Sequence, residues 1–87
     1  MAQDHYVKAL EYFQKALAID EKVLGKEHPG TATDYNNIGV MYYEMKEYPK
    51  ALEYLGKALS VRISKLGNDH PDTKATQRWI DLTKAAM

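Results

Sequence analysis

The chain has 87 residues, of which 45% are hydrophobic, and its twelve basic side chains balance twelve acidic ones. This length fits one small domain or a piece of a larger one, and the zero net charge argues against nucleic acid as a partner, because phosphate neutralisation dominates that affinity. The absence of cysteine excludes disulfides, zinc–thiolate sites and a thiol nucleophile.

The sequence repeats itself, and this is its most informative feature. Residues 6–31 align without a gap onto residues 48–73, and more than half of the aligned positions are identical. A match of this extent at a single offset indicates that the chain holds two copies of one supersecondary unit.

The first copy begins with a predicted helix over residues 3–24. Its apolar residues fall at i, i+3, i+7 and i+14, which is one face of a helix. These residues are Leu10, Phe13, Leu17 and Leu24. Gly25 follows directly, and a glycine with a left-handed backbone commonly closes a helix at this position.

A second, shorter helix is predicted over residues 30–45. Its apolar residues are spaced at i, i+3, i+7 and i+10 and comprise Tyr35, Ile38, Tyr42 and Met45. Pro29 stands just before this segment, where the missing N–H group of proline does not disturb the first turn of a helix.

The second copy predicts helices over residues 48–66 and 71–86, after a brief break at Lys46-Glu47. The third helix repeats the apolar face of the first, with Leu52, Leu55, Leu59 and Leu66. No segment alternates as a strand does, and connections this short force neighbouring helices to run antiparallel. The predicted fold is therefore all-α, with four helices in a single domain of residues 1–87.

The spacing of small and large residues in this unit resembles the tetratricopeptide repeat. In that family, a first helix carries a small residue beside apolar ones, and a second helix carries two alanines seven residues apart. The matching positions are Ile38, Gly39 and Tyr42 on the first helix, Ala51, Leu55 and Ala58 on the second, and Ala9, Phe13 and Ala16 on the second helix of a preceding repeat. The small residues let helix backbones approach closely, and the large ones fill the space beside them.

The repeat period, which runs from Tyr6 to Tyr48, is longer than the roughly 34 residues of the usual tetratricopeptide repeat. It resembles the subtype found in kinesin light chains. In that subtype a long second helix ends in Leu-Gly, and a His-Pro-x-Thr segment leads into the next repeat, as at residues 24–31 and 66–73 here. The resemblance implies an antiparallel helix-hairpin solenoid of about two repeats.

The chain begins within such a unit, with a second-type helix that has no partner before it. We therefore expect a fragment of a longer array or a module that completes itself by association. We also expect part of the apolar stripe of the first helix to be exposed.

The resemblance further implies a non-enzymatic scaffold that binds an extended peptide segment of a partner protein on its concave face. Asn37 matches a family position whose side-chain amide holds the ligand backbone, and an amide suits this task because it both donates and accepts. The residues on or beside this face are Asn36, Asn37, Val40, Tyr43, Glu44, Arg78, Trp79 and Leu82. Two alternatives remain: the asparagines are ordinary polar surface residues, or the chain is a self-assembling module that oligomerises through its terminal helices.

The last predicted helix departs from the family pattern. Asp81 occupies the place of Gly39, and Lys84 that of Tyr42, so this helix is either a polar cap that closes the stack or a helix that packs differently. A second apolar stripe on it comprises Ala75, Trp79, Leu82 and Ala86. This stripe either buries the terminal helix or forms a contact surface for a peptide or a second copy, where tryptophan is enriched.

No pattern in the sequence points to catalysis, a cofactor or a metal. His28 and His70 each precede a proline at the repeat distance, so turn chemistry explains both, and His5 stands alone. No apolar stretch approaches the roughly 18–20 residues that cross a bilayer, and the first four residues do not form a signal peptide. We therefore expect a cytoplasmic protein with a protein or peptide partner and no nucleic-acid or membrane partner.

Overall fold

The computed structural model describes residues 2–87, in which four α-helices are joined by short turns. The helices are α1 (Ala2–Val23), α2 (Pro29–Glu44), α3 (Tyr48–Leu66) and α4 (Pro71–Ala86). The all-α prediction is confirmed, and every predicted helix boundary agrees with the structure to within one residue. Met1, which belongs to the expected domain of residues 1–87, lies outside the described residues.

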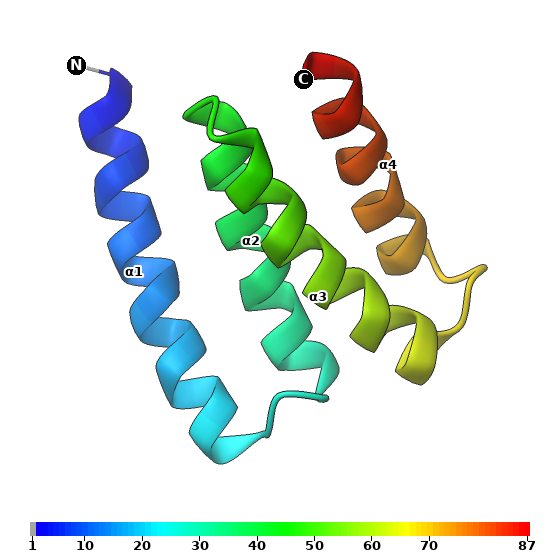
Figure 1. Cartoon of the computed structure of the whole chain (residues 1–87). Helices are drawn as coiled ribbons and strands as arrows, with labels where there is room; N and C mark the ends of the chain where they lie inside the picture. The colour runs from blue at the N-terminus through cyan, green and yellow to red at the C-terminus, as the bar shows by residue number, and fades with distance from the viewer. Residues whose placement is uncertain (1) are drawn as a thin grey trace.

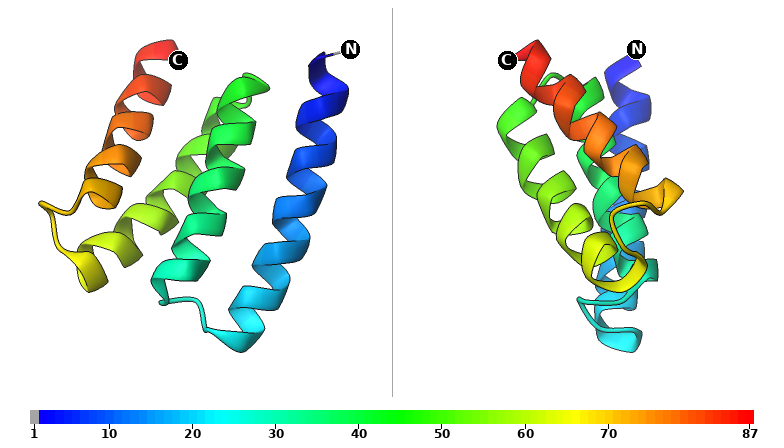
Figure 2. Two further views of the ribbon diagram at one scale, coloured as in Figure 1. Left: turned by 180° about the vertical axis from the view of Figure 1, so that it is seen from behind. Right: turned by 90° about the vertical axis from the view of Figure 1, so that its right-hand side faces the viewer.

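Consecutive helices run antiparallel, and they form two adjacent hairpins (Figure 1). Within residues 2–87, α1 lies against α2 alone, whereas α3 lies against both α2 and α4. The views in Figure 2 show the same order, with α1 and α4 on the two flanks of the central α2–α3 pair. None of the helices in this described part is both long and apolar enough to cross a membrane.

The predicted glycine and proline signals at the helix ends are confirmed, and the structure adds a cap from the histidine before each proline. Gly25 and Gly67 have φ angles of 89° and 91°, a region that side chains other than glycine rarely adopt. The Nδ1 atom of His28 accepts a hydrogen bond from the N–H of Gly30 at 2.9 Å, and Nδ1 of His70 accepts one from the N–H of Asp72 at 3.0 Å. Each histidine therefore caps the helix that its neighbouring proline begins.

The core lies where α2 crosses α3, and Gly39 permits the close approach of the two helices. A Cβ atom at Gly39 would lie 2.6 Å from Cγ of Leu55 and 3.1 Å from its backbone nitrogen. Both distances are shorter than ordinary van der Waals contacts, so only a glycine fits here without a shift. The buried cluster around this crossing contains Ile38, Tyr42, Ala51, Leu55 and Ile80.

The fourth helix buries a different stripe from the apolar one that we considered for it. Its buried residues are Thr73, Thr76, Ile80 and Thr83. Ala75, Leu82 and Ala86 are exposed, so the interpretation that their stripe buries this helix is wrong. Ile80 is aligned with Ile38 in the repeat, so α4 keeps the register of α2. Thr73 and Thr76 take the places of Thr31 and Asp34, which are also buried and polar.

One side of α1 is left uncovered. We call it the open face of α1, and it consists of Ala9, Tyr12, Ala16, Ile19 and Val23. The three large side chains are 70%, 62% and 72% exposed in that order. The expectation that part of the predicted stripe is exposed is confirmed by Leu24, which is 41% exposed. Leu10, Phe13 and Leu17 pack against the core, so the open face of α1 adds apolar surface that the stripe did not predict.

Candidate functional site

The predicted binding residues lie on α2 and α4, the helices that match the first helix of the repeat, and the structure brings two of them into direct contact. The ring centroids of Tyr43 and Trp79 are 5.5 Å apart in an edge-to-face arrangement. Tyr43 also contacts Tyr48 at 5.8 Å. This aromatic contact fixes the indole beside α2 although the two helices share few other contacts.

An apolar strip with polar ends surrounds this contact, and we call it the α2–α4 face. It consists of Asn37, Val40, Tyr43, Glu44, Trp79 and Leu82. Val40 and Trp79 are half-buried against the core, whereas Leu82 is 43% exposed and Glu44 faces solvent. The strip therefore combines a rigid aromatic anchor with accessible apolar surface.

The two predicted asparagines have different surroundings. Oδ1 of Asn36 accepts a hydrogen bond from Oγ1 of Thr76 at 2.9 Å, so this amide joins α2 to α4. Asn37 is half-buried, and its side chain forms no hydrogen bond within the described part of the chain. The amide of Asn37 is thus available to donate to and accept from a ligand.

The partner of Asn36 belongs to a buried polar network that the sequence reasoning missed. Arg62 of α3 is 6% exposed, and its Nη1 donates to Oγ1 of Thr76 at 2.8 Å and to the carbonyl oxygen of Asp72 at 3.1 Å. Its Nη2 donates to Oγ1 of Thr33 at 3.3 Å. Burial lowers the pKa of Arg62, and these hydrogen bonds offset the loss of water around the guanidinium. The network ties α2, α3 and α4 together.

The corresponding place between α1 and α2 holds two carboxylic acids. In the alignment of the two copies, Asp20 occupies the position of Arg62, and Asp34 that of Thr76. Asp34 is 7% exposed, and its Oδ2 has no hydrogen-bond partner within the described residues. Burial, followed by the neighbouring carboxylate of Asp20, raises the pKa of Asp34 to about 7.

This raised pKa makes the stability of the protein depend on pH. The folded state binds the proton of Asp34 more tightly than the unfolded state, in which the pKa is near its ordinary value of 3.8. The stabilisation is therefore fully present below about pH 4 and is lost as the pH rises through about 7. We expect the urea midpoint to fall over this range, and the Asp34→Asn variant to lose this decline. The same decline in that variant would contradict the assignment.

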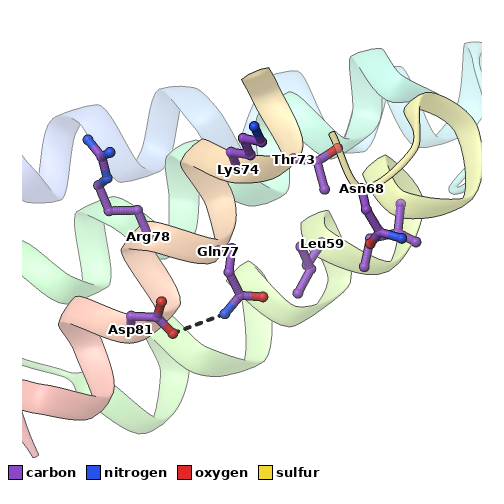
Figure 3. Close-up of a pocket in the computed structure, with 8 residues that line it drawn as sticks. Leu59, Asn68, Thr73, Lys74, Gln77, Arg78 and Asp81 are labelled. Carbon is purple, nitrogen blue, oxygen red and sulfur yellow. Dashed lines mark hydrogen bonds between the residues drawn. The ribbon is translucent and has the colours of Figure 1, made fainter. Parts of the chain in front are cut away.

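Arg78 lies in the wall of an open pocket of about 340 Å³ between the ends of α3 and α4. Figure 3 shows Gln77 and Asp81 joined by a hydrogen bond, which measures 3.0 Å, with Arg78 extending away from them. Leu59 and Ile63 contribute apolar surface to this pocket. Arg78 also lies one helical turn before Leu82 on α4, so its predicted grouping with Trp79 and Leu82 stays a prediction.

Within the described residues, no three histidine, aspartate or glutamate side chains lie close enough to hold a metal ion.

A known protein family matches most of the chain. The family model described as "Tetratricopeptide repeat" matches residues 1–64, and a second match covers residues 35–78. No curated protein matches the chain.

Proposed function

Because the chain belongs to the tetratricopeptide repeat family, whose members are typically non-catalytic scaffolds for protein–protein interaction, we propose that it binds an extended peptide segment of a partner along the α2–α4 face. The observation that carries this proposal is the contact of Tyr43 with Trp79. The same face of α2 carries Asn37, whose side-chain amide forms no hydrogen bond within the described residues. In this role Asn37 pairs with one peptide group of the ligand, and Trp79 covers a neighbouring side chain.

The same proposal includes two finer points. The long repeat period and the repeated Leu-Gly and His-Pro-x-Thr segments favour the repeat subtype found in kinesin light chains. A cytoplasmic location is in keeping with the lack of cysteine, because a domain without disulfides suits a reducing compartment.

Substitutions on the α2–α4 face test the proposal. After a peptide-array screen has identified a binding sequence, we expect Trp79→Ala to weaken its affinity by about tenfold or more, as loss of an interface anchor does. Asn37→Ala should weaken it by about fivefold, the value of one hydrogen bond. Isothermal calorimetry gives both numbers, and circular dichroism shows whether each variant keeps its helices.

The chain offers matched controls for both substitutions. Asn68→Ala removes an exposed amide in the α3–α4 turn, and Tyr12→Ala removes an exposed aromatic ring on α1. Both controls should bind the peptide as the unchanged protein does. If Trp79→Ala and Asn37→Ala also leave the affinity unchanged, the assignment of the groove is wrong.

Self-association through the terminal helices is the second candidate function, and the open face of α1 favours it. The two ends of the structure differ, however. The side of α4 that corresponds to the α3-facing side of α2 carries Gln77, Asp81 and Lys84, all of them exposed. Any such association therefore relies on the open face of α1. The residues on and beside this face determine which helix it can bind.

A further inference from the structure

The internal repeat shows what the open face of α1 is shaped to receive. Ile19 of α1 is 62% exposed, whereas Val61, its counterpart on α3, is 4% exposed. The counterparts of Ala9 and Ala16 are Ala51 and Ala58, which are fully buried. The two helices differ in their neighbours, because α3 is covered by α2 on this side and α1 has no such neighbour within the described residues (Figure 1). The open face thus has the residues of a binding surface for one helix.

The contact of α2 with α3 defines the packing that such a helix needs. Gly39 lies over Leu55, and the ring of Tyr42 lies 5.6 Å from that of Tyr54. Phe13 and Tyr12 are the counterparts of Leu55 and Tyr54 on α1. A helix on the open face therefore requires a small residue over Phe13, with apolar or aromatic residues beside it.

Two acidic residues beside the open face, Asp20 and Asp34, indicate that a helix bound there carries a positive charge. In the second copy, Thr33 and Asn36 of α2 contact Arg62 and Thr76, respectively. The same two positions on a helix that covers α1 would face the places of Arg62 and Thr76 in the first copy, which are Asp20 and Asp34. Asp20 is half-buried at the edge of the open face, and Oδ2 of Asp34 lacks a partner within the described residues. A cation at these positions complements the pair.

We propose that the open face of α1 binds an amphipathic helix of a partner protein that directs an arginine or lysine at Asp20 and Asp34 and places a small residue over Phe13. This surface lies on the opposite flank of the fold from α4 (Figure 2). The proposal is independent of peptide binding on the α2–α4 face, because it uses none of the residues of that face.

A second copy of the chain fits the open face of α1 less well. Its α4 would present Arg78 at the required position, but it would also place Asp81 over Phe13, where Gly39 lies over Leu55. Its α1 would bring a second acidic pair toward the first. The observations therefore favour a partner helix that combines the cation with a small residue.

A synthetic peptide with the sequence of residues 29–44, acetylated and amidated at its ends, serves as the probe. We compare three forms, in which the position of Asn36 holds arginine, the original asparagine or glutamate. At pH 8 the arginine form should bind about tenfold more tightly than the asparagine form, and the glutamate form more weakly still. Fluorescence anisotropy of the labelled peptide measures the affinity. Equal affinities for the three forms would overturn the proposal.

Substitutions in the full chain locate the binding. Ile19→Glu should weaken binding of the arginine form by about tenfold or more. Asp34→Asn should remove the preference for arginine, because Asp34 is the counterpart of Thr76, the residue that Asn36 contacts. Ala18→Glu is the matched control, since it adds the same charge to an exposed position on the other side of α1. Binding that survives Ile19→Glu would show that the peptide replaces α2 within the core, and it would overturn the proposal.

Sedimentation of the chain alone distinguishes the partner helix from a second copy. We expect a monomer across the concentration range used for the peptide measurements. A dimer that dissociates when Arg78 is changed to glutamate would overturn the proposal in favour of a second copy. Because Trp79→Ala leaves the open face intact, it should bind the arginine form normally, so failure of the groove assignment and failure of this one are distinguishable.

Discussion

Leu55→Ala should lower the free energy of unfolding by about 2–5 kcal/mol, the range measured for leucines truncated in well-packed cores. Leu55 is fully buried at the crossing of α2 and α3, within the cluster that includes Ile38 and Tyr42. The backbones of α2 and α3 already approach closely here, since a Cβ atom at Gly39 would lie 3.1 Å from the backbone nitrogen of Leu55, so the helices have little room to move and fill the cavity. A domain of this size has only a few kcal/mol to lose. Urea denaturation followed by circular dichroism measures the change.

Ile63→Ala provides the control for this truncation. Ile63 is on the same helix but is 40% exposed, so its removal should cost less than about 1 kcal/mol. The two variants lose comparable apolar groups from one helix, and only their burial differs. Equal losses of stability would mean that the α2–α3 crossing is not the centre of the core.

Gly39→Ala should destabilise the protein by about 1–3 kcal/mol, although alanine favours helix formation over glycine. The added methyl group would lie 2.6 Å from Cγ of Leu55, which is not the mobile end of that side chain. It would also lie 3.1 Å from the backbone nitrogen of Leu55. The helices must therefore separate, and the contacts around the crossing loosen. Thermal and urea unfolding both report this loss.

Gly56→Ala is the matched control, because this glycine is also inside a helix. A Cβ atom there meets nothing within 4 Å, so the substitution should stabilise the protein by about 0.5–1 kcal/mol through helix propensity alone. The two glycine substitutions should thus change stability in opposite directions. If both stabilise the protein, the close approach at Gly39 is absent.

The helix boundaries could be predicted from the sequence because the signals that set them are local. The spacing of apolar residues and the Leu-Gly and His-Pro pairs each act within a few residues, and the duplication supplied each signal twice. The buried stripe of α4 could not be predicted in this way. Thr76 and Thr83 are polar by composition, yet their hydroxyl groups bond to Asn36, Arg62 and the carbonyl oxygen of Trp79 within the fold. Burial of these threonines depends on partners that periodicity does not reveal.

In the candidate site, too, some features could be predicted from the sequence and others depend on contacts within the fold. Resemblance to the family placed Asn37, Tyr43 and Trp79 on neighbouring helices, and the structure brings the two aromatic rings together. It did not distinguish Asn36, whose amide is held by Thr76, from Asn37. The departure from the repeat at Asp20 and Arg62 was the available signal, since an acid in one copy and a base in the other indicates two different junctions.

A double-mutant cycle of Gly39→Ala and Leu55→Ala tests most directly whether the duplicated helices pack through this close contact. The smaller side chain at residue 55 removes the Cγ atom that a methyl group at residue 39 would strike. The account predicts that the double variant is more stable than the sum of the two single losses implies, with a coupling of about 0.5–3 kcal/mol. Strictly additive losses would contradict it, because residues that do not touch do not couple.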